Sequence, residues 1–212
     1  MPRPNRQNGP MSAEMKEQVR SRFKKLRRDL PETVSTAQGL RAAAAPLLQP
    51  LKPGSLVSCY LSAGKEPDTT DLLQAITLAG HTVVVPVCEP DHQLSWCVWT
   101  PDTELVPGLF PGIPEPAGPR LDLTRVLGLD LLLIPALAAA SDGVRMGKGG
   151  GYYDRFLTAF RARGGTAPVV ALVHDHEFVP AGGLPADALD VPVDGILTPS
   201  GYTRSDGREV YT

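Results

Sequence analysis

The sequence predicts an α/β fold: a single domain of three layers, α/β/α, around a mostly parallel, twisted sheet. Short apolar runs alternate with helical segments between residues 56 and 198, which is typical of parallel strands covered by helices. Residues 131–134 are apolar throughout, as expected of a strand buried on both faces. The chain contains no internal repeat and no convincing linker between domains. These features favour one sheet over two separate units.

The composition indicates a compact globular protein. With 212 residues, 42% of them hydrophobic, the chain can bury one sizeable core. A net charge of −2 argues against a nucleic-acid scaffold. Three scattered cysteines are too few for a disulfide framework, and no apolar stretch is long enough to cross a bilayer. The polar N-terminus is not a secretory signal, so we expect a cytoplasmic protein.

The N-terminal part predicts a disordered lead over residues 1–10, followed by one domain over residues 11–212. A helix is expected over residues 11–30, because apolar side chains recur there at steps of three and four and Pro31 follows. Its other faces are dense with lysine and arginine, which we interpret as a solvated basic surface. An alanine-rich helix is expected over residues 33–48.

The middle of the chain predicts the first half of the sheet. The expected elements are a strand over 56–61, a loop over 62–68, a helix over 69–79, a strand over 83–87 ended by Pro86 and Pro90, and a half-exposed strand over 94–99. Six prolines between residues 101 and 119 make the next segment too proline-dense for regular structure. The second half of the sheet is expected from strands over 131–134, 169–173 and 195–198, with a helix over 152–163.

A glycine cluster between a buried strand and a helix is the most informative feature. Residues 141–156 read SDGVRMGKGGGYYDRF, with glycines at Gly143, Gly147, Gly149, Gly150 and Gly151. In an open α/β sheet, ligands bind at the carboxyl ends of the strands, where such a turn lies. Glycines let the backbone approach an anion closely, and the N–H groups that begin the next helix point at it. Arg145 and Lys148 add positive charge, so the turn favours phosphate or nucleotide binding over a merely flexible surface turn.

Two named phosphate motifs do not match this turn. A P-loop requires four residues between its glycines and Ser or Thr after the lysine, whereas Gly149 follows Lys148. A dinucleotide-binding fingerprint would require glycine where Tyr152 stands.

Residues 130–156, DLLLIPALAAASDGVRMGKGGGYYDRF, strongly resemble the 5-formyltetrahydrofolate cyclo-ligase family, also called 5,10-methenyltetrahydrofolate synthetases. The family's turn, Asp-Gly-x-Arg-x-Gly-x-Gly-x-Gly-Tyr-Tyr-Asp, is met from Asp142 to Asp154. Weaker matches agree in order and spacing over residues 11–200: the Lys16/Arg20 pair, Tyr60 with Glu66 and Thr69, residues 112–116, and Asp190 to Asp194 followed by Thr198.

The resemblance implies ATP-dependent cyclisation of 5-formyltetrahydrofolate to 5,10-methenyltetrahydrofolate, with Mg²⁺ as cofactor. In that reaction ATP phosphorylates the formyl oxygen, N10 attacks the activated carbon, and phosphate leaves. The implied partner is the folate, in a monoglutamyl or polyglutamylated form. We expect a monomer that binds neither nucleic acid nor a membrane.

The resemblance also assigns residues. The ATP-binding residues are Lys16, Arg20, Arg145, Met146, Gly147, Lys148, Gly149, Gly150, Gly151, Tyr152 and Tyr153. The substrate-binding residues are Leu61, Glu66 and Tyr152, and the metal ligands are Asp154 and Asp194. Lys148 stands where members of the family vary. Lys16 and Arg20 lie one helical turn apart, so both can face the same phosphates.

From the residues alone, plainer interpretations stay open. Asp154 could serve only as a favourable charge in the first turn of a helix, Asp194 as a loop carboxylate, and Glu66 as an ordinary surface residue. The pair His174 and His176 is interpreted as a solvated strand end, while Trp96 and Trp99 are expected to pack in the core or at an edge.

Two other functions are weighed against the cyclo-ligase. One is a non-catalytic nucleotide- or RNA-binding protein, which the basic first helix would suit. The other is a sugar-phosphate isomerase or sensor, which would need neither Lys16 with Arg20 nor Asp154 with Asp194.

Overall fold

The computed structural model describes residues 13–31 and 36–206. The predicted disordered lead and the first residues of the predicted second helix lie outside the described residues. Within them, no helix is both long and apolar enough to cross a membrane.

Seven strands form one sheet in the described part of the chain, in the order β12-β11-β9-β6-β1-β2-β3. The five inner strands are parallel, and an antiparallel strand flanks them at each edge. Their bounds are β1 Leu56–Ser58, β2 Thr82–Glu89, β3 Gln93–Trp99, β6 Leu131–Pro135, β9 Val169–Leu172, β11 Gly195–Thr198 and β12 Gly201–Arg204. The prediction of a mostly parallel sheet is confirmed.

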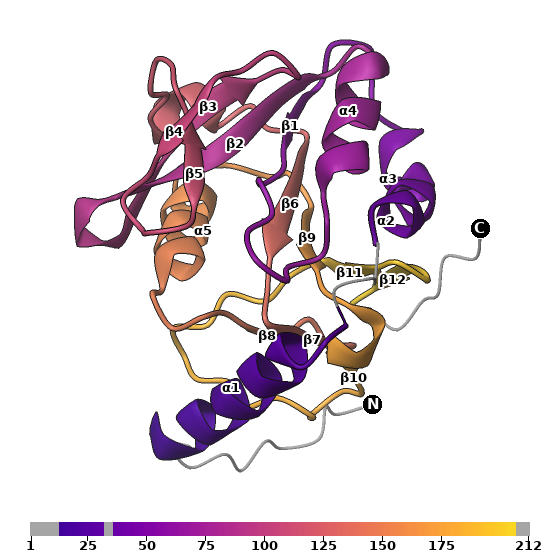
Figure 1. Ribbon diagram of the computed structural model, residues 1–212, viewed down its shortest axis with the longest axis vertical. Coiled ribbons are helices and arrows are strands. Elements are labelled where there is room, and N and C mark those ends of the chain that lie inside the picture. The colour runs from indigo at the N-terminus through magenta and orange to yellow at the C-terminus, as the bar shows by residue number, and fades with distance from the viewer. Residues whose placement is uncertain (1–12, 32–35, 207–212) are drawn as a thin grey trace.

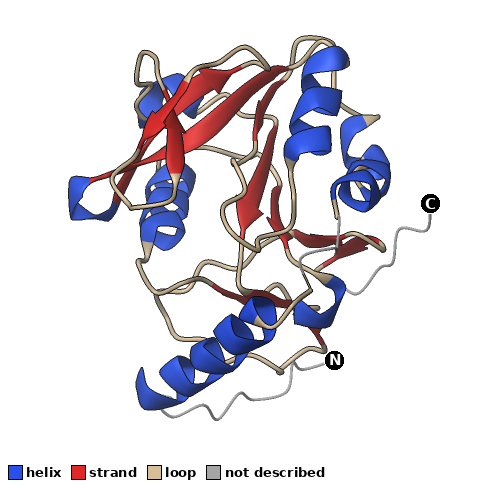
Figure 2. Ribbon diagram, viewed as in Figure 1, coloured by secondary structure: helices blue, strands red, loops and turns tan. Residues whose placement is uncertain are grey.

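Helices cover both faces of this sheet (Figures 1 and 2). On one face lie α2 (Ala37–Ala43), α3 (Ala45–Leu48) and α4 (Thr70–Leu78), whose apolar side chains form one buried cluster with the strands. On the other face α5 (Tyr152–Ala162) packs Phe156, Leu157 and Phe160 into a second cluster. The three-layer prediction is therefore confirmed.

The first helix, α1 (Ala13–Arg28), lies apart from these layers, against a small sheet (Figure 1). That sheet has the order β10-β7-β8, with bounds Phe178–Val179, Ala138–Ala140 and Arg145–Met146. Phe23 packs into its apolar cluster. Arg27 is buried and donates to both carboxylate oxygens of Glu177, at 2.6 and 2.5 Å, and to the carbonyl of Ala136 at 2.7 Å. This buried ion pair anchors the helix next to the glycine turn.

Pro86 does not end a strand, contrary to the prediction. β2 continues through it to Glu89, and Pro86 lies opposite Trp96 of β3. Trp96 directs its N–H and carbonyl away from β2, to the carbonyl and N–H of Leu121 at 2.9 and 2.7 Å. The Pro86–Trp96 pair thus exchanges no backbone hydrogen bonds, so the missing N–H of proline costs no hydrogen bond to β3.

The proline-rich segment also contains regular structure, which corrects the prediction of a loop. β4 (Leu105–Pro107) and β5 (Pro114–Pro116) form a two-stranded antiparallel ribbon. Each strand of a two-stranded ribbon keeps a free edge, where a residue without an N–H is tolerated. The predicted helix over residues 33–48 is likewise divided, since α2 ends at Ala43 and the short α3 begins at Ala45 with Pro46 in its first turn.

Candidate active site

A large cavity opens at the carboxyl ends of the central strands. Tyr60 and Leu61, which follow β1, line it together with Cys88 of β2 and Ala136 after β6. The strand order reverses at β1, since β2 lies on one side of it and β6 on the other, and open α/β sheets bind ligands at such a point. The cavity measures about 1200 Å³. A pocket for one small ligand measures roughly 300–1,000 Å³, so this cavity has room for two substrates.

The first turns of α1 place Lys16 and Arg20 on the cavity wall. Lys16 Nζ donates to Oδ2 of Asp187 at 2.6 Å and to Oδ2 of Asp190 at 2.5 Å. Burial lowers the pKa of Lys16, but the hydrogen bonds and charges of the two carboxylates outweigh burial and raise it above its ordinary value. The hydrogen bond from Lys16 in turn lowers the pKa of Asp187. Lys16 is therefore charged and held in place.

Arg20 joins α1 to the glycine turn. Its Nε donates to the carbonyl of Gly147 at 3.2 Å, and its Nη1 pairs with Glu17. Gly149 and Gly151 have φ angles of +108° and +68°, in the region that favours glycine, and Gly151 precedes the first residue of α5. A Cβ on Gly149 would lie 3.4 Å from Arg20 Nε. The glycine turn therefore has backbone that no side chain covers, next to the Arg20 guanidinium and at the start of α5. This geometry is typical of phosphate sites.

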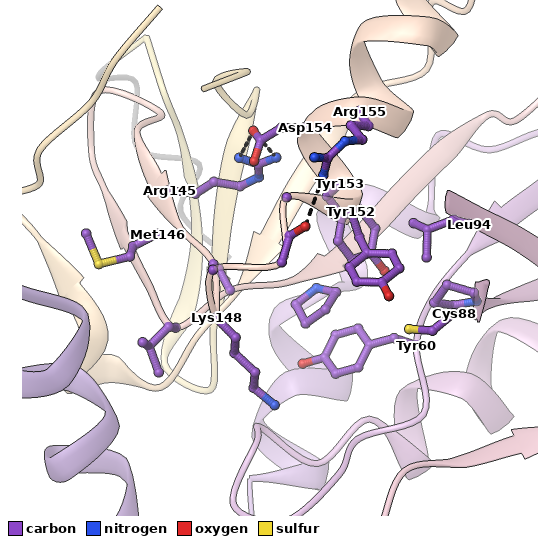
Figure 3. A pocket seen from close by; sticks show the side chains of 18 of the residues that line it. Tyr60, Cys88, Leu94, Arg145, Met146, Lys148, Tyr152, Tyr153, Asp154 and Arg155 are labelled. Atoms are coloured by element: carbon purple, nitrogen blue, oxygen red, sulfur yellow. Dashed lines mark hydrogen bonds and ion pairs between the residues drawn. The ribbon is translucent and has the colours of Figure 1, made fainter. Parts of the chain in front are cut away.

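Arg145 and Asp154 form an ion pair on the same side of the cavity (Figure 3). Arg145 lies in β8 with its side chain 5% exposed, and both of its terminal nitrogens donate to Asp154 Oδ1, at 2.9 and 2.8 Å. The same oxygen accepts the N–H of Val191 at 3.1 Å. Asp154 thus holds three segments together, and is more than a favourable charge at the start of a helix.

Glu66 lies on the cavity wall with its side chain 8% exposed, so its interpretation as an ordinary surface residue is wrong. It pairs with Lys148 Nζ at 2.6 Å and accepts the N–H of Ala63 at 3.0 Å. Lys148 comes from the glycine turn, and this ion pair links the turn to the loop after β1. Figure 3 shows Lys148 extending toward the side of the cavity where Tyr60 lies.

Aromatic and apolar side chains form the opposite wall of the cavity. Tyr152 contacts Phe110 and His92 edge-on, at centroid distances of 6.1 and 5.3 Å. The hydroxyls of Tyr60 and Tyr153 are buried with no hydrogen-bond partner in the described part of the chain, and burial raises both pKa values well above their ordinary value. Both tyrosines therefore stay protonated and can donate to a ligand. Leu61, Leu94 and Ile113 complete this wall.

The structure does not bring Asp194 to the cavity. Asp194 immediately precedes β11, at the amino ends of the parallel strands, whereas the cavity lies at their carboxyl ends. Its carboxylate pairs with Arg161 at 3.1 Å and accepts the N–H of Val169 at 2.8 Å, which fits the plainer interpretation of a loop carboxylate. The other predicted site residues all line the cavity.

The cavity could hold Mg²⁺ with two carboxylates. The described residues contain no group of three or more potential metal ligands. Asp154 and Asp190 both line the cavity, and Val191, the neighbour of Asp190, donates to Asp154. Mg²⁺ prefers oxygen ligands and is often bound by one or two carboxylates together with phosphate oxygens and water. This donor set fits Mg²⁺ carried by a nucleotide.

Three acidic side chains of the cavity are not among the predicted site residues. Asp187 and Asp190 pair with Lys16, and Glu115 is buried, accepting the N–H groups of Cys88 and Leu109 at 3.3 and 3.4 Å. The two aspartates come from a loop more than 170 positions after Lys16, so only the fold joins them. For Glu115, its place between two prolines in the segment that resembles the family was a usable signal.

The predictions for the two tryptophans and for His174 had different outcomes. Trp96 and Trp99 are buried, which confirms their expected place in the core. The interpretation of His174 as solvated is wrong, because it is buried, stacks on His176 and bonds the carbonyl of Lys65 through Nε2 at 3.0 Å. Its backbone N–H is also used, since it donates to Glu177 at 2.9 Å.

Together, the open parallel sheet and the cavity at its reversal point define an α/β protein that binds small molecules. The model of the 5-formyltetrahydrofolate cyclo-ligase family matches residues 12–199. The chain therefore belongs to the 5-formyltetrahydrofolate cyclo-ligase family, as the resemblance in its sequence predicts.

Individual relatives agree with this assignment. A 5-formyltetrahydrofolate cyclo-ligase of Mycolicibacterium smegmatis is 36% identical over 195 residues, which cover 89% of this chain and 96% of the relative. One of Escherichia coli is 34% identical over 68% of this chain and 78% of the relative. The solved structure of Aquifex aeolicus 5,10-methenyltetrahydrofolate synthetase is 26% identical and superposes with a TM-score of 0.71, covering 93% of this chain and 97% of that one.

Proposed function

We propose that this chain catalyses the ATP- and Mg²⁺-dependent cyclisation of 5-formyltetrahydrofolate to 5,10-methenyltetrahydrofolate, with release of ADP and phosphate. The observation that carries the proposal is a single cavity of about 1200 Å³ with two unlike walls. One wall consists of cations and a glycine turn, and the other of aromatic and apolar side chains. Such a cavity suits a reaction that brings a nucleotide and a flat, partly apolar substrate together.

The cationic wall binds the phosphates of ATP. Lys16, Arg20 and Arg145 contribute charge from two directions, and the backbone of residues 146–153 surrounds the phosphates from the glycine turn to the start of α5. Phosphoryl transfer depends mainly on alignment and on neutralising charge, so these groups supply most of the catalysis. In the described structure carboxylates already hold these cations in position, so the phosphates add to existing ion pairs on binding.

Asp154 and Asp190 would hold Mg²⁺ beside the phosphates. The ion supplies charge neutralisation on the transferred phosphoryl group. Asp154 also keeps Arg145 in place, whereas Asp190 keeps Lys16 in place. Each carboxylate thus orients a cation of the phosphate site.

The aromatic wall binds the folate. Glu66 accepts hydrogen bonds from the N–H groups of the pterin head, Leu61 and Tyr152 pack against its ring system, and the Tyr60 hydroxyl donates to a polar atom of the ligand. The formyl oxygen then attacks the γ-phosphorus, and the bond from phosphorus to the β–γ bridging oxygen breaks to release ADP. N10 attacks the activated carbon and loses its proton, and the C–O bond breaks so that the former formyl oxygen leaves in inorganic phosphate.

The geometry favours this function over a sugar-phosphate isomerase or sensor. A sugar-phosphate isomerase or sensor would have no need for Lys16 and Arg20 on the cavity wall, yet both line it. We further propose a monomer, since residues of one chain form both walls of the cavity.

The proposal is tested by mixing the purified chain with Mg-ATP and 5-formyltetrahydrofolate, then following the absorbance of methenyltetrahydrofolate and the formation of ADP. We expect both products in equal amounts, and neither when ATP or the folate is omitted. A folded sample that forms no methenyltetrahydrofolate would refute the proposed function.

A further inference from the structure

Arg155 is a cation of the main cavity, the one of about 1200 Å³ described above, and it has no acidic partner in residues 13–31 and 36–206. The lysine and arginine side chains that line this cavity are Lys16, Arg20, Arg145, Lys148 and Arg155. The first four each form an ion pair with an aspartate or a glutamate. Arg155 instead donates from Nη1 to the carbonyl of Gly150 at 3.1 Å. A guanidinium has five N–H donors, so this contact leaves both charge and donors for a ligand.

The side chain of Arg155 lies on the side of the glycine turn opposite to Glu66. Arg155 comes three residues after Tyr152 in α5, so the two side chains share a face of the helix. Figure 3 shows Arg155 and Lys148 extending in opposite directions from the segment that joins the glycine turn to α5, with Tyr152 between them in the view. Lys148 Nζ contacts Glu66 at 2.6 Å. Glu66 and Arg155 therefore mark two ends of the cavity, with Tyr152 between them.

The cavity opens to solvent at the end where Arg155 lies. Arg155 is exposed, and so are Thr158 and Ala162, which follow at steps of three and four on the same face of α5 and also line the cavity. A ligand with a charged end can therefore keep that end hydrated here while its apolar part is buried further in. This end suits the charged terminus of an elongated molecule.

We propose that Arg155 binds the glutamate carboxylates of 5-formyltetrahydrofolate, an inference that rests on the proposed function. With the pterin head at Glu66 and its ring system beside Tyr152, the elongated folate directs its glutamate away from Glu66, toward Arg155. The glutamate carries the carboxylates of this molecule, and a guanidinium matches a carboxylate with two parallel N–H groups. The phosphates of ATP do not require Arg155, because three other cations and the glycine turn surround them.

A purely structural role for Arg155 makes a different prediction. Its Nη1 holds the carbonyl of Gly150, and a Cβ on Gly151 would lie 2.7 Å from the same Nη1 atom, so the side chain also packs on the glycine turn. If Arg155 only supported the turn, its loss would weaken binding of ATP and of every form of the folate. A contact with the glutamate is lost only when the ligand carries the carboxylates.

The test is equilibrium binding by isothermal titration calorimetry, with the full chain and without ATP, so that no turnover occurs. The two ligands are 5-formyltetrahydrofolate and its diamide, in which carboxamides of equal size replace both glutamate carboxylates. Arg155→Gln removes the charge but keeps a hydrogen-bond donor, and Arg155→Lys keeps the charge. The control is Arg163→Gln, at an exposed position that ends the same helix outside the cavity lining.

We expect Arg155→Gln to weaken binding of 5-formyltetrahydrofolate about five- to tenfold and to leave binding of the diamide about unchanged. Arg155→Lys should retain most of the affinity, and Arg163→Gln should change neither ligand. Equal weakening of both ligands, or an equal loss in the control, overturns the proposal. Weaker binding of a non-hydrolysable ATP analogue with unchanged binding of the folate also overturns it, because Arg155 would then serve the phosphates.

These outcomes are separate from the test of the proposed function. A chain that forms methenyltetrahydrofolate but binds the folate and its diamide equally well overturns only the role of Arg155. A chain that shows the expected dependence on Arg155 but forms no methenyltetrahydrofolate refutes only the proposed reaction.

Discussion

The two walls of the main cavity differ in how they are held before any ligand binds. On the cationic wall each charged group already has a partner within the protein, as in Lys16 with Asp190 and Arg145 with Asp154. On the aromatic wall the hydroxyls of Tyr60 and Tyr153 have no partner in the described chain. Ligand phosphates therefore join cations that are already paired on the first wall, whereas on the second wall a ligand satisfies donors that have no partner. Substitutions on the cationic wall should consequently change turnover. Substitutions on the aromatic wall should mainly change the affinity for the folate or the reactivity of side chains in that wall.

The largest effect is expected from Asp154→Asn. The amide keeps the size of the side chain but removes the charge that pairs with Arg145 and that would bind Mg²⁺. We expect kcat/KM to fall by about a thousandfold or more, because charge stabilisation at the transferred phosphoryl group is lost. Circular dichroism should show an unchanged fold.

Asp194→Asn is the matched control for this substitution. Asp194 carries the same charge, but its carboxylate pairs with Arg161 at the amino ends of the parallel strands, away from the cavity. The kcat/KM of the Asp194→Asn variant should stay within a few-fold of the wild-type value. A loss equal to that of Asp154→Asn would restore Asp194 as a metal ligand and contradict the site described above.

The anchoring of the cationic wall is tested by Arg27→Met. This substitution leaves Glu177 buried and unpaired, and breaking a buried ion pair from one side costs about 3–5 kcal/mol. The free energy of unfolding in urea should fall by about that amount. Because Lys16 and Arg20 lie on the same helix, the KM for ATP should also rise, while binding at the aromatic wall changes less.

The double variant Arg27→Met/Glu177→Leu separates charge from packing. Replacing both partners by apolar residues of similar size removes the unpaired charge, so much of the lost stability should return. A double variant as unstable as the single one would show that the contact of Arg27 with the carbonyl of Ala136 matters more than the ion pair.

A smaller effect is expected from Glu66→Gln, at the boundary between the two walls. The amide no longer pairs with Lys148 and accepts weaker hydrogen bonds from the pterin. We expect the KM for 5-formyltetrahydrofolate to rise about tenfold, with little change in the KM for ATP, since a hydrogen bond to a charged group contributes about 1.5–3 kcal/mol. Steady-state kinetics with each substrate varied in turn measure both values, and exposed Glu104→Gln is the control. A rise confined to the KM for ATP would assign Glu66 to the nucleotide instead.

The sequence allowed the fold and most of the cavity to be predicted, because their signals are local. The five inner strands were predicted from apolar runs, and the limits of β11 match the predicted residues 195–198. The glycine turn lies where the order of strand, turn and helix places it. The prediction that Pro86 ends a strand was wrong. Whether a strand tolerates a proline depends on which neighbouring strand its missing N–H would face, and only the register with Trp96 shows that.

Long-range pairings could not be predicted in the same way. Nothing local marks Asp187 and Asp190 as partners of Lys16, or Glu177 as the partner of Arg27. Asp190 and Asp194 stand four residues apart, but Asp190 lines the cavity whereas Asp194 immediately precedes β11, at the amino ends of the strands. Which of two nearby carboxylates serves a site depends on where the strand begins.

The last test concerns Cys88, which is half-buried and lines the cavity. Burial, followed by the nearby charge of Glu115, raises the pKa of Cys88 to about 11, and burial raises that of Cys59 to about 12. Only the thiolate reacts with iodoacetamide, so at pH 8 Cys88 should react roughly a hundredfold more slowly than an ordinary cysteine, whose pKa is about 8.5. Its rate should rise about tenfold per pH unit, and bound folate should suppress it further because Cys88 lines the cavity. Mass spectrometry of the Cys88 peptide measures the rate, with the buried Cys59 as an internal control. If Cys88 reacts as fast as free glutathione, burial does not raise its pKa, and the contrast between a buried aromatic wall and an ion-paired cationic wall does not hold.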